Sequence, residues 1–421
     1  MSKLFEKISR SPEYIGTTEI VKLMDRADAM SGNVQLMRDN FETLKKICVK
    51  IINLARKNEE WFAFFGCAKG FLWLLTVNND IKMMIKYSEL IEREKKVHLE
   101  ETCTRYPKQR PNLYVWAASY DWMDLVYFGM PQISDKRFEQ SMQEWEEHCR
   151  SIQVLSRYLD HSLFINTMST PDMNQCEKYA EELVSILESS HPKERIYCYI
   201  CSTLGLRSYY VKTKQFDLLD EHLHNVMARN IPKRFHNCYG DCWFTQKNIR
   251  LVQQVLYRAI DFGCYDYFWK LIEEYRELFE ASASDKENYS GTNLLFYLIL
   301  GIEIELDADV FQEAADNTKN LKNFKNTYFY FIDDNIVFLL IFRLLQYLGK
   351  DRIPVNGDII DTFHLEPGDY CDVSILEERM EKELDEAADI FCKSRKKFNY
   401  REKKENNLAL LDSFKERRGE N

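Results

Sequence analysis

Four cysteines with metal-ligand spacing are the first candidates for chemistry in this chain. Two residues separate Cys198 from Cys201, three separate Cys238 from Cys242, and His236 lies next to the second pair. Four thiolates, or three thiolates and an imidazole, would suit a tetrahedral zinc ion. However, the first pair falls in a strongly helical run, and nothing around it resembles a zinc knuckle. The pattern favours buried thiols over a metal site, and we expect no cofactor.

Other catalytic signatures are weak or absent. Arg93 and His98 fit the loose Arg-x(4–6)-His pattern of small helical ribonuclease domains, but a chain rich in arginine and lysine is expected to match it by chance. His222 and His224 would point in different directions on a helix, which disfavours joint ligation. The sequence has no phosphate-binding loop, dinucleotide fingerprint, nucleophile elbow or zinc-protease motif. We therefore expect a protein without catalysis, and an enzyme with an unrecognised site remains a third alternative.

Composition favours a helical protein with a substantial core. The 421 residues are 45% hydrophobic, and only 14 are glycine and 9 proline. Each proline falls where the apolar periodicity breaks, as expected for helices separated by loops. The net charge of −10 argues against nonspecific nucleic-acid binding, which needs a basic face.

Two apolar runs raise the question of a membrane. Residues 61–77 are interrupted by Lys69, and residues 336–348 contain Arg343 and Gln346. Both fall short of the roughly 20 apolar residues that a span needs, so we expect buried helices and no membrane partner. The N-terminus lacks the apolar region of a signal peptide, and the twelve cysteines are scattered. These features favour a cytoplasmic protein with reduced thiols.

The most regular stretch, residues 193–232, predicts two amphipathic helices, 194–211 and 216–228, joined by a polar turn. Apolar residues recur at helical spacing in both: Tyr199, Leu204, Leu206 and Tyr210, then Leu219, Leu223, Val226 and Met227. Neither helix can bury its stripe alone. Similar pairs recur about every 40 to 50 residues, which is typical of stacked helical hairpins.

The residue pattern of these pairs resembles tetratricopeptide repeats in degenerate form, over roughly residues 30–350. The turn Gly263-Cys264-Tyr265 matches, with Val252, Val255 and Leu256 before it and Phe268, Ile272 and Tyr275 after it. Arg207 and Leu219 depart from the small residues of the family, the period exceeds about 34 residues, and HEAT-like repeats are the rival interpretation. The resemblance implies an all-α fold, an α-solenoid of antiparallel helical hairpins that forms a right-handed superhelix.

This interpretation divides the chain into four parts. Residues 1–30 form an N-terminal segment, 31–350 the solenoid, 351–373 a loop, and 374–421 an amphipathic helix followed by a basic tail. Residues 393–421 carry ten Lys or Arg and five Asp or Glu. For this tail we favour a solvated C-terminus over a docking arm.

Solenoids bind partners on a concave face lined by the first helix of each hairpin. Arginine and asparagine there can hold a peptide backbone or its terminal carboxylate. The candidates are Tyr114, Tyr120, Arg207, Tyr210, Asn248 and Arg258, joined by Arg234 and Trp243 from the irregular stretch 231–247; the alternative is that the aromatics belong to the core. We expect a non-catalytic protein- or peptide-binding scaffold or adaptor. The alternative is a peptide-responsive regulatory sensor without its own DNA-binding domain, and the oligomeric state stays open.

Overall fold

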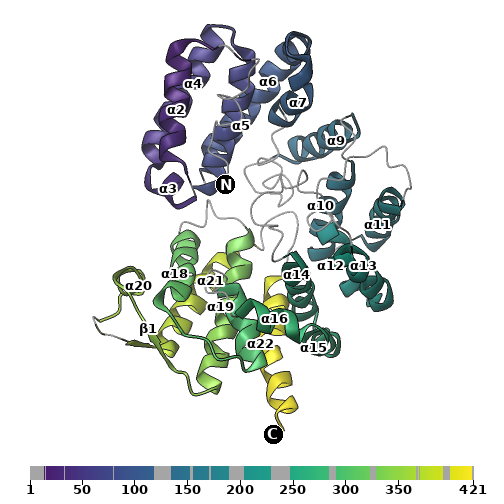
Figure 1. Ribbon diagram of the computed structural model, residues 1–421, viewed down its shortest axis with the longest axis vertical. Helices are drawn as coiled ribbons and strands as arrows, with labels where there is room; N and C mark the ends of the chain where they lie inside the picture. Colours follow the sequence, from purple (N-terminus) through teal and green to yellow (C-terminus); the bar gives the residue numbers. More distant parts are fainter. Residues whose placement is uncertain are drawn as a thin grey trace. The chain divides into compact units, whose positions relative to one another are not determined.

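The computed structural model divides the chain into two compact units, Met1–Leu155 and Ser156–Asn421, each of which is described by itself (Figure 1). Both are mainly helical in their described parts, which confirms the all-α class, while the solenoid arrangement stays a prediction. The structure describes residues 14–419, except 15, 33, 79, 118–133, 152–154, 170–171, 189–202, 229–246, 284–290, 323–328, 367, 369 and 392–398.

Unit 1 is organised around α5 (Trp61–Val77), which packs against its neighbours α4, α6 and α7. Phe64, Phe65 and Phe71 of α5 are fully buried, so the apolar run 61–77 is the core of this unit. Among the described residues, none of the helices combines the length and apolarity that crossing a membrane requires. The other elements are α2 (Thr18–Met30), α3 (Val34–Asp39), α4 (Phe41–Lys57), α6 (Ile81–Arg105), the 3-10 turn η1 (Pro107–Gln109), α7 (Arg110–Ala117) and α9 (Asp135–Ser151).

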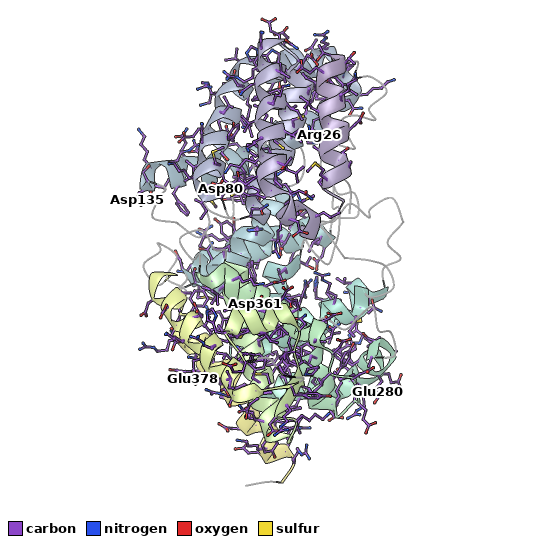
Figure 2. The ribbon with its side chains drawn as sticks, turned by 90° about the vertical axis from the view of Figure 1, so that its left-hand side faces the viewer. Arg26, Asp80, Asp135, Glu280, Asp361 and Glu378 are labelled. Atoms are coloured by element: carbon purple, nitrogen blue, oxygen red, sulfur yellow. The ribbon has the colours of Figure 1, made fainter. Side chains whose placement is uncertain are left out.

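The start of α6 shows how polar residues connect these helices. Asp80, labelled in Figure 2, precedes α6 and accepts a hydrogen bond from the backbone N–H of Met83 at 3.2 Å. Its other carboxylate oxygen accepts from Lys45 of α4 at 2.6 Å. A carboxylate at this position satisfies an otherwise unpaired N–H of the first helical turn. Asp80 therefore both caps α6 and ties it to α4.

The first helices of unit 2 include two of the predicted hairpins as packed pairs. α12 (Leu204–Lys212) contacts α13 (Phe216–Ala228), and α14 (Lys247–Asp261) contacts α15 (Tyr265–Glu274). Gly263 joins the second pair with a φ of 65°, a left-handed conformation that glycine adopts without strain. The remaining helices before the C-terminal region are α10 (Leu155–Met168), α11 (Met173–Glu188), α16 (Arg276–Ala283), α17 (Gly291–Leu300), α18 (Ala308–Lys322) and α19 (Phe329–Tyr347).

Gly205 marks the close approach of α12 to α10. A Cβ atom at this position would collide with the backbone carbonyl of Asp160 and lie 2.7 Å from the backbone nitrogen of Phe164. Since neither backbone atom can move independently of its helix, only glycine lets the two helices come this close. The same approach lets the Asp160 carboxylate accept the N–H of Gly205 at 2.8 Å.

The region predicted as a loop, residues 351–373, contains regular structure and corrects that expectation. β1 (Arg352–Pro354) and β2 (Tyr370–Asp372) pair as antiparallel strands, with Ile353 opposite Cys371. Helix α20 (Gly357–Phe363) lies between them in sequence and begins at Asn356, whose side chain accepts from Ile359 N–H at 3.0 Å. The strands are three residues long, too short for alternation in the sequence to predict them by itself.

The C-terminal region also differs from the prediction of a solvated tail. α21 (Val373–Phe391) is followed by α22 (Tyr400–Arg417), which packs against both α14 and α19. The buried residues of α22 recur at helical spacing: Tyr400, Lys403, Asn407, Leu410 and Phe414. Because the stripe includes a lysine and an asparagine, its hydrophobic pattern is weak. Lys403 forms ion pairs with α14 and α19, and Asn407 donates a hydrogen bond to Asp261 of α14.

Candidate functional site

Arg258, a predicted partner-binding residue, lies in a buried group of charges. We call Arg258, Asp261, Asp333 and Lys403 the ionic cluster; they come from α14, α19 and α22. Arg258 is 2.9 Å from Asp261 and 3.9 Å from Asp333, and Lys403 is 3.2 Å and 2.5 Å from the same two carboxylates. Asn407 of α22 also donates to Asp261 at 3.0 Å.

The ionic cluster is balanced in charge but removed from water. The side chains of Lys403, Asp261 and Asp333 are 10%, 4% and 15% exposed. Burial raises the pKa of Asp333, although Lys403 and Arg258 oppose the shift. Burial, followed by the carboxylates of Glu313 and Asp333, raises the pKa of the adjacent Asp334 to about 8. This arrangement joins three helices and leaves little of these charges accessible to a partner.

Arg207 is fully buried in unit 2, so the expectation of an exposed guanidinium does not match its placement. It donates to Thr203 Oγ1 at 2.6 Å and to the side-chain oxygen of Gln254 on α14. Nearby, Asp160 accepts the N–H groups of Gly205 and Leu206 at the start of α12. Burial raises the pKa of Asp160 to about 6, and the charge of Arg207 opposes that shift. Arg207 therefore contributes to the packing of α12 against α14.

The remaining predicted residues are scattered. Tyr210 is buried in α12, and Asn248 is half-buried in the first turn of α14. Tyr114 belongs to α7 in unit 1, and the structure does not describe its side chain. The described part of the chain contains no group of three His, Cys, Asp or Glu residues placed to hold a metal. Tyr120, Arg234 and Trp243, together with Cys198, Cys201, Cys238 and Cys242, lie outside the described residues.

The Arg93 and His98 pair lies on α6, around a carboxylate. Glu94 accepts from Arg56 at 2.8 Å and from Arg93 at 3.2 Å, and His98 Nε2 is 3.8 Å away from it. The His98 ring stacks on Trp61 of α5, with centroids 3.6 Å apart. His98 thus contacts α5, and Arg93 pairs with the same carboxylate of α6 that accepts from Arg56 of α4.

Sequence reasoning missed two exposed apolar side chains where β2 meets α21. Tyr370 and Ile375 are 65% and 45% exposed, and Asp372 and Ser374 between them also face solvent. We call these four residues the sheet patch. Asp372 accepts both the N–H of Ser374 at 2.8 Å and its hydroxyl at 2.6 Å, which caps α21. The signal available in the sequence was the alternation from 370 to 374, in which Cys371 and Val373 are the buried members.

Comparisons with known proteins add no relationship. No family model matches the chain, and searches of curated proteins and of solved structures find no match. The tetratricopeptide-like repeat therefore stays a prediction from the residues.

Proposed function

We propose that this chain is a cytoplasmic, non-catalytic scaffold that binds a protein or peptide partner at the sheet patch of unit 2. The exposure of Tyr370 and Ile375 carries the proposal. Large apolar side chains are normally buried on folding. Here two of them are exposed within six residues and are available to a partner. Tyrosine is also enriched among residues that dominate binding energy.

The elements beneath the sheet patch support this role because they are held in place. β2 pairs with β1, and Asp372 caps α21. Arg343 of α19 donates to Glu377 of α21 at 2.6 Å. Lys404 of α22 contacts Glu381 of α21 at 2.8 Å. A surface fixed in this way loses little conformational entropy when a partner binds.

The test is affinity capture of partners from the native cytoplasm with quantitative mass spectrometry. The tagged full-length chain is compared with a variant that carries Tyr370→Ser and Ile375→Ser. A matched control is Leu218→Ser on α13, because Leu218 is 47% exposed. We expect a stoichiometric partner that the wild type and the control retain and the double variant loses. Identical partner sets for all three proteins would contradict the proposal.

Buried residues make poor probes in this experiment. Alanine at Arg207 would remove the positive charge that opposes burial of Asp160, and alanine at Arg258 would leave Asp261 and Asp333 to share Lys403 alone. Loss of a partner would then report unfolding rather than a lost contact. The sheet patch avoids this difficulty because Tyr370 and Ile375 are largely exposed.

A further inference from the structure

Acidic side chains are frequent in the sequence around the sheet patch. Residues 351–378 contain eight Asp or Glu and a single Arg. Asp361 of α20, Glu366 and Glu378 of α21 are all exposed, and none of the described cations forms an ion pair with them. Their charge is therefore uncompensated within the described chain.

Glu378 shares a helix face with Ile375 of the patch. It follows Ile375 by three residues, a spacing that makes side chains neighbours on a helix surface. The cations nearby in sequence are fewer than the carboxylates: Arg352 pairs in register with Asp372 across the sheet, Arg379 directly follows Glu378, and Lys382 lies one turn beyond it. The surface thus combines two apolar side chains with an excess of carboxylates.

We propose that the sheet patch recognises a basic amphipathic segment of a protein partner. Apolar side chains of that segment pack on Tyr370 and Ile375, and its lysines or arginines pair with Asp361, Glu366 and Glu378. The ring of Tyr370 also offers a face to a cation. The inference rests on the proposed function and adds the chemistry of the partner.

The negative charge near the sheet patch disfavours other kinds of partner. Nucleic acids and anionic lipid headgroups carry negative charge, which the carboxylates repel. A second copy of this chain that docked through the same surface would bring the same acidic residues against themselves. A basic segment is attracted from a distance, so its association slows as salt screens the charges.

The experiment measures binding of a fluorescein-labelled peptide in which lysine and leucine alternate at helical spacing, by fluorescence anisotropy, to the full-length protein. The charge-reversed variant carries Asp361→Lys, Glu366→Lys and Glu378→Lys. Its control is Glu280→Lys on α16, which Figure 2 places on the opposite side of unit 2 from Glu378. We expect at least a tenfold loss of affinity in the charge-reversed variant and in the Tyr370→Ser, Ile375→Ser variant, and less than twofold in the control.

Equal affinity of wild type and charge-reversed protein would overturn the inference, as would tighter binding of a glutamate-for-lysine peptide, of single-stranded RNA or of phosphatidylserine vesicles. Thermal unfolding of each variant confirms that it is folded. The partner captured from the cytoplasm distinguishes the proposed function from the proposed basic chemistry of that partner. If Tyr370→Ser with Ile375→Ser releases it while charge reversal does not, the function stands and the basic chemistry is wrong. If neither variant releases it, both are wrong.

Discussion

Replacing Lys403 by methionine tests whether the ionic cluster holds α22 in place. Lys403 is 2.5 Å from Asp333 and 3.2 Å from Asp261. Methionine keeps much of the length but removes the charge, so Asp261 and Asp333 would share Arg258 alone. Removing one partner from a buried charge pair costs about 3–5 kcal/mol. Because these side chains are at most 15% exposed, water screens the remaining charges little.

A second substitution separates charge imbalance from lost packing. Asp333→Asn in the Lys403→Met background returns the ionic cluster to neutrality, with Arg258 facing Asp261. We expect the double variant to be more stable than the sum of the two single effects predicts, by about 2 kcal/mol. The cost of Lys403→Met should also fall at acid pH. The raised pKa of Asp333 would rise further in the variant, so the cluster takes up a proton as the pH falls.

Urea unfolding followed by circular dichroism gives these free energies. The chain has two compact units, and chains of more than one domain often unfold in more than one step. Hydrogen exchange of the α22 amides therefore assigns the change to unit 2. The reasoning is refuted if Lys403→Met costs less than about 1 kcal/mol, or if the two substitutions add within about 0.5 kcal/mol.

Three further changes test other parts of unit 2. Gly205→Ala should cost about 1–3 kcal/mol in urea unfolding, since its Cβ meets the backbone of α10; an unchanged midpoint would contradict the close approach. Asp334 has a pKa raised to about 8, so its stability contribution is lost as pH rises from about 4 to 8, by up to about 1.4 kcal/mol per pH unit. The melting temperature of the Asp334→Asn variant should therefore fall less steeply with rising pH than that of the wild type. Parallel dependences of the two melting temperatures on pH would contradict this prediction. Ending the chain at Asn399 removes α22 and should increase binding of a hydrophobic dye and lower stability by roughly 3 kcal/mol or more, whereas a solvated tail could be removed without effect.

Local periodicity determined much of the helical structure. The predicted helices 61–77 and 216–228 coincide with α5 and α13, because apolar spacing and the residues at helix ends are properties of neighbouring residues. The turn at Gly263 was predictable for the same reason: glycine adopts its positive φ without strain. The class of fold thus followed from the sequence alone.

Tertiary structure decided which polar residues are buried and which apolar residues stay exposed. A sequence pattern does not show that Arg207 meets Gln254, or that Asn407 reaches Asp261 from 146 residues away. It also left Tyr370 within a presumed loop, although a short strand pair holds that side chain in solvent. A charge is buried only where another helix, often distant in sequence, supplies a counter-charge. The hydropathy of neighbouring residues does not identify that counter-charge. The candidate site therefore depended on the packing of α19, α21 and the strand pair, which no local pattern specifies.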